Sequence, residues 1–231
     1  MNSPKHDNTL IVIPAYNEAT HIESLLKKIR QQGFDRILIV DDASEDDTAA
    51  IARANGARVI RHVINRGPGA ATQSGIEYAR MHNYARMVTI DADNQHDPED
   101  IAKLLERLDR GDVDLVIGNR FMRGDNFIPR SRVIYNGIAN LITFLFSRHW
   151  ISDTQSGMKA LNRKAIENTQ LGTDGFEFCS EWVIKAGLMH LRIAEVPIKV
   201  YYTEESRKKG QGFLTGIRTL SSLFHQLLLR H

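Results

Sequence analysis

The stretch VTIDADNQHDPEDI, residues 88 to 101, joins a predicted strand to a predicted helix through a cluster of carboxylates. Apolar and β-favouring residues run directly into Asp91, Asp93 and Asp97, and Pro98 then opens a helical pattern. A buried strand that passes straight into a helix is the repeating unit of a parallel sheet. Carboxylates this close repel one another, so the cluster must lie in water or be neutralised by a cation.

The same strand-to-helix alternation extends in both directions from this stretch. Strands are predicted at residues 9–15, 36–44, 57–62, 85–93 and 114–120, and helices at 19–33, 45–56, 67–83 and 97–111. This order predicts an α/β fold, a Rossmann-like, mostly parallel central sheet with helices on both faces.

After Arg120 the pattern changes. The following elements are predicted in order: a basic loop at 121–132, an apolar helix at 133–150, a turn and short strand at 153–163, a helix at 176–191, an edge strand at 193–202, a loop at 203–212 and an amphipathic helix at 213–231. With no linker or repeat, we expect one domain over 1–231. Its predicted parts are a ligand-binding half at 9–120, a second half with a mobile loop at 121–212, and the helix at 213–231.

Composition excludes several classes of protein. Of the 231 residues, 42% are hydrophobic and 25% charged, which is typical of a soluble globular chain, and a net charge of +2 is too small to indicate nucleic-acid binding. Cys179 is the single cysteine, so an internal disulfide is excluded. The polar start and the lack of a membrane-length apolar run predict a cytoplasmic protein.

Polar residues follow three of the predicted strands, at 14–18, 40–44 and 91–95. Ligands of open parallel sheets bind outside the carboxyl ends of the strands, so these clusters predict a binding site. Helix capping is the alternative, in particular for Asp42 and Ser44.

The acidic cluster itself predicts a divalent-metal site. Asp91 and Asp93 alternate along an extended chain and point in opposite directions unless the chain turns there. Asp93 and Gln95 share a face, and their oxygen atoms suit Mg²⁺ or Mn²⁺, which would also take substrate phosphate oxygens. His96 is interpreted as structural. In NRGPGAA, residues 65–71, the glycines are predicted to allow close backbone approach near a ligand, with a plain strand-to-helix turn as the alternative.

The ordered motifs IPAYNE, VDDASEDDT, NRGPGAA, DADNQHDPEDI, GNR and DTQSGMKAL resemble those of the family 2 glycosyltransferases. The resemblance covers nearly the whole chain. It is strongest to the branch with dolichol-phosphate mannose synthase and the bacterial polyprenyl-phosphate glycosyltransferases. It implies a GT-A fold, a UDP- or GDP-linked sugar donor and a divalent metal.

The resemblance also implies residue roles. Metal ligands would be Asp93 and Gln95, and Arg120 would reach substrate phosphate, while Arg130 and Arg132 lie where the branch binds acceptor phosphate. In the loop at 203–212, Arg207 matches the family's arginine. In the mannose synthases a lysine follows this arginine, but the matching position here is near Phe213. Its role would then belong to Lys208 or Lys209, and the identity of the donor sugar is left undetermined. The implied nucleotide-sugar contacts are Pro14, Tyr16, Glu18, Val40, Asp42, Ile90, Asp91, Ala92, Arg207 and Lys209.

The sequence therefore predicts an inverting, metal-dependent hexosyltransferase that moves a sugar onto polyprenyl phosphate. Asp153 is the candidate general base, with a structural turn at DTQSG as the equal alternative. A phosphate anion as nucleophile needs no base. The alternatives are transfer to a saccharide hydroxyl, which needs a base, and a non-catalytic nucleotide-sugar binding module. A nucleotidyltransferase is disfavoured, because IPAYNE is not its glycine- and lysine-rich loop.

Two apolar helix faces, at 138–146 and 213–228, remain to be explained. They are predicted either to pack in the core or in a homo-oligomer, or to lie on the cytoplasmic face of a membrane beside the lipid acceptor. A membrane-protein partner is the other way in which the chain would reach that acceptor.

Overall fold

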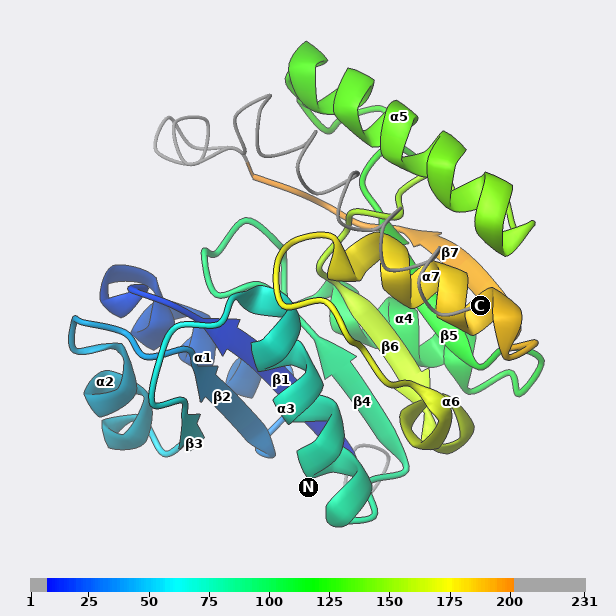
Figure 1. The fold of residues 1–231 in the computed structure, drawn as a ribbon. Helices are drawn as coiled ribbons and strands as arrows, with labels where there is room; N and C mark the ends of the chain where they lie inside the picture. Colours follow the sequence, from blue (N-terminus) through cyan, green and yellow to red (C-terminus); the bar gives the residue numbers. More distant parts are fainter. Residues whose placement is uncertain (1–7, 202–231) are drawn as a thin grey trace.

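In the computed structural model, which describes residues 8–201, a seven-stranded sheet runs in the order β3-β2-β1-β4-β6-β5-β7 (Figure 1). The pairings among the strands are parallel except those of β6, which is antiparallel to both β4 and β5. The predicted mostly parallel sheet is confirmed, and so is the edge position of the last strand. The strands are β1 Thr9–Ala15, β2 Ile37–Asp41, β3 Arg58–Arg61, β4 Arg86–Thr89, β5 Leu115–Asn119, β6 Lys159–Asn162 and β7 Ile193–Pro197.

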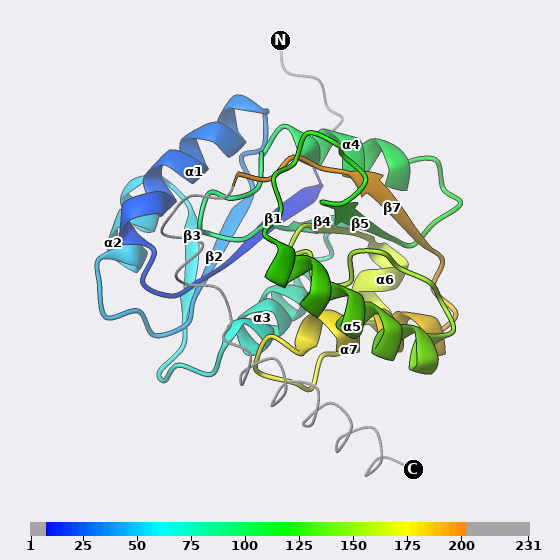
Figure 2. The same ribbon diagram turned by 90° about the horizontal axis from the view of Figure 1, so that it is seen from above.

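Helices cover both faces of this sheet (Figure 2). On one face lie α1, α2 and α4, and on the other lie α3, α6 and α7, with α5 packed outside α7. The helices are α1 Ala19–Gln31, α2 Thr48–Ala54, α3 Pro68–Met81, α4 Asp100–Leu108, α5 Arg130–Ser147, α6 Arg163–Asn168 and α7 Phe178–Leu188.

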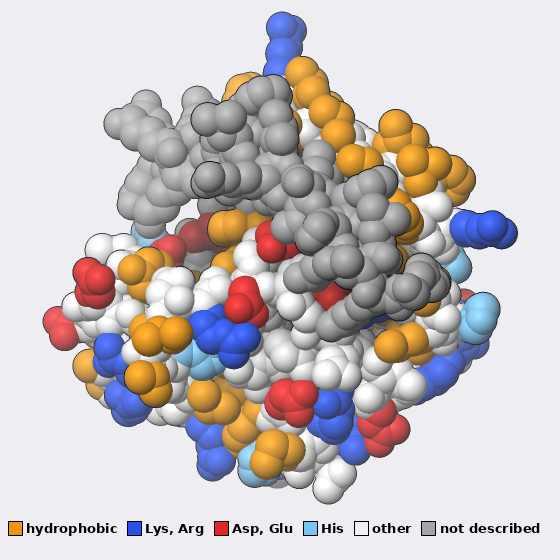
Figure 3. Space-filling view, viewed as in Figure 1, with side chains coloured by type: hydrophobic (Ala, Val, Ile, Leu, Met, Phe, Trp, Pro, Cys, Tyr) orange, Lys and Arg blue, Asp and Glu red, His pale blue; other side chains and the backbone are white. Residues whose placement is uncertain are grey.

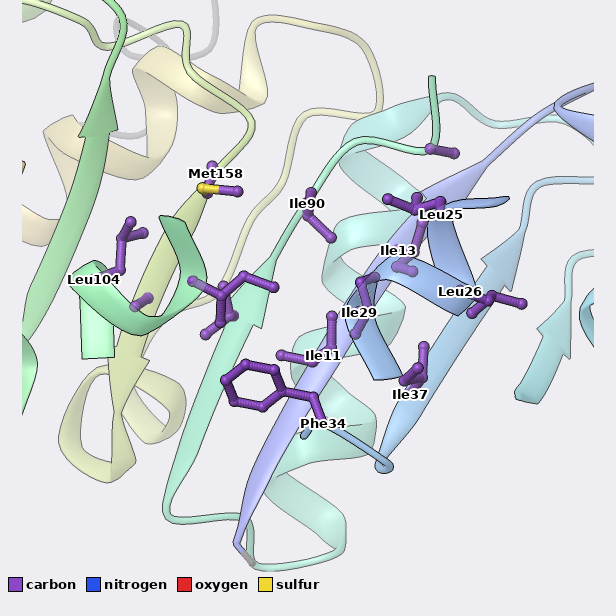
Figure 4. Packing of buried hydrophobic residues seen from close by; sticks show 14 of the residues in the cluster. Ile11, Ile13, Leu25, Leu26, Ile29, Phe34, Ile37, Ile90, Leu104 and Met158 are labelled. Carbon is purple, nitrogen blue, oxygen red and sulfur yellow. The ribbon is translucent and has the colours of Figure 1, made fainter. Parts of the chain in front are cut away.

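The central strand β1 shows why both faces need cover. Alternate residues feed two separate hydrophobic clusters, with Ile11 and Ile13 on the α1 side and Leu10 and Val12 on the α3 side. Figure 4 shows Ile11 and Ile13 between β1 and α1. A strand buried in this way holds the loop at its carboxyl end in a fixed place.

Several predicted boundaries differ from the structure. The short helix α6 was not predicted; it begins where the Asn162 side chain accepts a hydrogen bond from the Ala165 N–H. The helix predicted from residue 97 begins at Asp100, and the helix predicted from residue 133 begins at Arg130. In the part of the chain that the structure describes, no helix is long and apolar enough to cross a bilayer.

Candidate functional site

The loops after β1 and β2 form one continuous wall at the edge of the sheet. Asn17, whose backbone is left-handed at a φ of 55°, donates its N–H to Ser44 Oγ at 2.9 Å. Its side-chain oxygen accepts the Glu45 N–H at 2.8 Å. The Glu18 N–H donates to Thr48 Oγ1 at 2.8 Å. These bonds hold the first two predicted motifs together as a unit.

The predicted nucleotide contacts near this wall fall into two groups. Pro14 is half-buried, and the Tyr16 ring is 42% exposed beside it, where a base or sugar could meet it. By contrast, Val40, Ile90 and Ala92 have their side chains in the hydrophobic clusters. Any contact of those three residues with a nucleotide would therefore use their backbone atoms.

Asp42 is buried and already has several partners. Its Oδ1 lies 2.6 Å from His62 Nδ1, and its Oδ2 accepts the Gly67 N–H at 2.6 Å. The Arg66 N–H also donates to it, and His62 Nε2 lies 2.9 Å from Ser74 Oγ. Asp42 thus fixes the loop before α3 and does not cap α2. A nucleotide base would have to share this carboxylate with the loop.

The glycines of NRGPGAA make a close approach, but the neighbour is protein backbone. A Cβ on Gly67 would lie 2.5 Å from the Asp174 carbonyl oxygen, and one on Gly69 would lie 2.2 Å from that of Thr173. The Gly69 N–H donates to the Asp174 oxygen at 2.8 Å. The prediction of close backbone approach is confirmed, and the structure shows it where the loop at 173–174 packs against the beginning of α3.

The acidic stretch after β4 turns sharply. Asn94 takes a left-handed φ of 59°, so the chain does not continue as an extended strand. Asp93 Oδ1 accepts the Gln95 N–H at 3.0 Å, and the Gln95 side-chain amide donates to Asp93 Oδ2. Asp91 Oδ2 instead lies 3.1 Å from His96 Nε2. The two carboxylates therefore have different partners, and Asp93 and Gln95 form the predicted pair.

The two carboxylates also differ in their tendency to ionise. Burial raises the pKa of Asp91, but the hydrogen bond and charge of His96 and the charge of Arg120 help to outweigh it, so its pKa lies below the usual value. Burial and the charge of Asp91 raise the pKa of Asp93, which the charge of Arg132 opposes. A cation beside Asp93 would favour its ionised form.

The donor atoms here fit an open site for Mg²⁺ or Mn²⁺. The Asp93 carboxylate and, once rotated, the Gln95 amide oxygen are hard oxygen ligands on one turn. Within residues 8–201, no three His, Cys, Asp or Glu side chains are grouped so that they could hold an ion. An ion bound to Asp93 and Gln95 would therefore keep waters or take oxygens from a substrate, which is the usual behaviour of Mg²⁺.

Arg120 and Asp153, both predicted as catalytic, form a buried ion pair. Asp153 is fully buried, and the Arg120 side chain is 12% exposed. Arg120 Nε donates to Asp153 Oδ2 at 2.8 Å and Nη2 donates to Oδ1 at 2.7 Å, while the Arg120 N–H donates to Oδ2 at 2.9 Å. This fork fixes the guanidinium in one orientation. It also occupies both oxygens of the predicted base.

The predicted acceptor arginines stand at the beginning of α5. Arg130 is exposed at its first position, and Arg132 is half-buried two residues further along. The charge of Arg132 acts on Asp93, so this end of the helix faces the acidic turn. The structure thus brings together the predicted metal ligands and one predicted acceptor arginine.

Helix α5 has its polar residues buried and its apolar residues exposed. Asn136, Asn140, Thr143 and Ser147 are buried at helical spacing. Figure 3 shows hydrophobic side chains gathered over this helix, so of the alternatives predicted for 138–146 the structure contradicts packing in the core and leaves a homo-oligomer contact and a membrane surface. We call these exposed side chains the outer face of α5, and they are Val133, Ile134, Ile138, Leu141, Phe144, Leu145 and Phe146.

The predicted loop residues Arg207 and Lys209 lie outside the described residues, as does the helix predicted at 213–231. The described chain ends beside the acidic turn, where the Tyr201 N–H donates to the Gln95 carbonyl oxygen at 2.8 Å. His96 and Val200 form an isolated bridge next to it. The last described residues, Val200 and Tyr201, therefore lie beside the predicted metal ligands.

Sequence reasoning missed four buried or half-buried polar residues that support this site. Glu195 on β7 and the two asparagines of α5, Asn136 and Asn140, bind the turn that carries Asp153. Lys159 is fully buried with its ammonium 5.5 Å from the Trp182 ring centre. A charge inside an apolar strand pattern was the available signal for Glu195 and Lys159. Their partners could not be inferred, because these contacts join distant parts of the chain.

The fold, with acidic and amide groups at the carboxyl ends of its strands, is that of the GT-A glycosyltransferases. Among solved structures, it is similar to glucosyl-3-phosphoglycerate synthase from Mycobacterium tuberculosis, crystallised with Mn²⁺, UDP and glucosyl-3-phosphoglycerate. The TM-score is 0.72 at 19% identity, over 96% of this chain and 81% of the other. At that identity the likeness establishes the fold.

The family model for glycosyl transferase family 2 matches residues 10–169, and the chain belongs to that family. It is 33% identical to the UDP-N-acetylglucosamine–dolichyl-phosphate N-acetylglucosaminyltransferase of Methanococcus voltae, over 95% of this chain and 94% of the other. It is 30% identical to the polyprenol monophosphomannose synthase of Mycolicibacterium smegmatis, over 94% and 84%. The protein is thus a glycosyltransferase that uses nucleotide-sugar donors, as predicted.

Proposed function

We propose that this glycosyltransferase moves a sugar, with inversion and with Mg²⁺ or Mn²⁺, from a nucleotide-sugar to a polyprenyl phosphate. The observation that carries the proposal is the outer face of α5. This helix exposes an apolar face, and its first turn carries Arg130 and Arg132, of which Arg132 lies near enough to the acidic turn for its charge to act on Asp93. A lipid phosphate needs both features, an apolar surface for the chain and cations for the head group.

The Arg120–Asp153 pair supports a phosphate nucleophile over a hydroxyl. Both oxygens of Asp153 accept hydrogen bonds from Arg120, so this carboxylate is poorly placed to take a proton from an acceptor. A lipid phosphate is already an anion at neutral pH and needs no base. In the proposed step a phosphate oxygen bonds to the anomeric carbon from the face opposite the leaving group, and the bond from that carbon to the nucleoside diphosphate breaks.

The residues of the chain have separate roles in this step. Asp93 and Gln95 would hold the divalent ion, which neutralises charge on the leaving diphosphate when bound. Arg120, which Asp153 holds in place, adds a second positive charge beside substrate phosphate. Arg132 would hold the acceptor phosphate near the acidic turn. Asp42 and Tyr16 line the side where the nucleoside would lie.

The relatives support a lipid phosphate acceptor, since the name of one states dolichyl phosphate and the name of another states polyprenol monophosphomannose as what it makes. The outer face of α5 would lie on the membrane surface beside such a lipid, which makes the protein peripheral there. No contact between copies of the chain is needed for this arrangement.

The test is transfer of radiolabelled sugar from UDP- and GDP-linked donors into butanol-extractable lipid, with Mn²⁺ or with a chelator. We expect labelled lipid with the metal, little without it, and a product of inverted anomeric configuration by NMR. Asp93→Asn should remove the manganese-dependent part of nucleoside diphosphate binding measured by calorimetry. Label only in a water-soluble saccharide would favour the hydroxyl-acceptor alternative. Binding with no transfer to any acceptor would favour a non-catalytic module.

A further inference from the structure

Glu195 on β7 accepts hydrogen bonds from three residues, all uncharged donors. Its Oε1 accepts the Asn119 side-chain amide at 2.7 Å and the Asp153 N–H at 3.0 Å. Both of its oxygens accept from Ser152, through the backbone N–H at 3.1 Å and through the hydroxyl at 3.0 to 3.2 Å. This half-buried carboxylate is therefore directed at the turn formed by Ser152 and Asp153.

The other side of the same turn is held by α5. The Asn136 and Asn140 side-chain amides donate to the Ser152 carbonyl oxygen at 3.0 and 2.7 Å. The Asn140 oxygen accepts the Thr154 N–H at 3.1 Å. The turn is thus fixed from the sheet by Glu195 and from the helix by the two asparagines.

The turn leads directly to the site. Asp153 is its second residue, and that carboxylate fixes the guanidinium of Arg120 by two side-chain hydrogen bonds. Asn119, which Glu195 also holds, is the residue immediately before Arg120 and is fully buried. Glu195 therefore acts on Arg120 in two ways, through Asn119, which precedes Arg120 in the chain, and through Asp153, the ion-pair partner of Arg120.

We propose that Glu195 is a positioning residue for the reaction, which sets the place of the Arg120 guanidinium without touching substrate. The inference rests on the proposed role of Arg120 toward substrate phosphate. Its uncharged partners support this role. Asp114, at the opposite end of β5, has Arg192 and Lys164 as cationic partners and serves to hold the structure together. Within residues 8–201, Glu195 forms no ion pair, so it orders neutral groups around the arginine.

A double-mutant cycle tests the proposal. Glu195→Ala should lower kcat about 10²-fold, since a misplacement of about 1 Å in an active site costs that much, with the affinity for nucleoside diphosphate little changed. In the Arg120→Ala background, the same change should cost almost nothing more, because its target is gone. Glu195→Gln keeps one acceptor oxygen and should recover most of the rate.

Asp114→Asn is the matched control, a carboxylate far from Arg120 that also accepts a backbone N–H. It should lower the melting temperature and leave kcat unchanged. Losses from Glu195→Ala and Arg120→Ala that multiply independently would overturn the positioning role, as would a Glu195→Ala enzyme with normal kcat. If Arg120→Ala itself costs nothing, the proposed role of Arg120 toward substrate phosphate fails instead, so the two failures are distinguishable.

Discussion

Replacement of Asp153 by asparagine should destabilise the protein far more than loss of an ordinary ion pair. The carboxylate is fully buried and receives three hydrogen bonds from Arg120, whose side chain is 12% exposed. Asparagine keeps one acceptor oxygen but turns an N–H₂ group toward the guanidinium. Loss of one partner of a buried pair costs about 3–5 kcal/mol, and we expect about 3 kcal/mol here because part of the bonding survives.

The control is Glu167→Gln on α6. Glu167 pairs with Arg163 at 2.8 Å, but its side chain is 51% exposed, so the change should cost about 0.3–0.5 kcal/mol. Urea denaturation followed by circular dichroism compares the two variants, and the midpoint should fall while the slope stays constant. Equal losses for Asp153→Asn and Glu167→Gln would refute the reasoning that the Arg120 fork is a buried, rigid unit.

Three further predictions concern the acceptor, the membrane and acid stability. Replacing Arg130 and Arg132 together by alanine should raise the lipid concentration needed for half-maximal transfer while calorimetry shows unchanged nucleoside diphosphate affinity. Leu145→Asp on the outer face of α5 should weaken sedimentation with vesicles, whereas Met81→Asp, at a slightly more exposed apolar site on α3, should not. Burial raises the pKa of Asp114, but hydrogen bonds, that from Arg192 foremost, hold its pKa well below the usual range. Its stabilisation is therefore present at pH 7 and lost as the pH falls below about 4, so Asp114→Asn should cost less stability at pH 2 than at pH 7.

The sequence predicted those parts of the fold in which apolar residues form a continuous run or recur at helical spacing. β1 and α1 follow from an apolar run and from Ile22, Leu25, Leu26 and Ile29 at helical spacing, all of which are buried. The insertion of β6 between β4 and β5 could not be predicted, since Thr89 pairs with Lys159 seventy residues away. No local periodicity encodes such a pairing, nor its antiparallel direction.

In the site, as in the fold, local features could be predicted from the sequence and contacts between distant residues could not. The turn at Asn94 and the pairing of Asp93 with Gln95 were within reach of local chemistry. Asp153 was predicted as a candidate base because the motif DTQSG shows the carboxylate but does not show which side chain binds it. Only the fold shows that Arg120 occupies its oxygens. The buried polar face of α5 was equally hidden, because an apolar helix pattern does not say which face points inward.

The most direct test of the central claim compares two acceptors that differ in one group. Wild-type enzyme is supplied with a nucleotide-sugar, Mn²⁺ and either a polyprenyl phosphate or the polyprenol of the same chain length, in the same vesicles. We expect labelled lipid from the phosphate and none above background from the alcohol, because the enzyme supplies cations for a phosphate and no base for a hydroxyl. Equal labelling of the alcohol, or labelling of the alcohol alone, would contradict it.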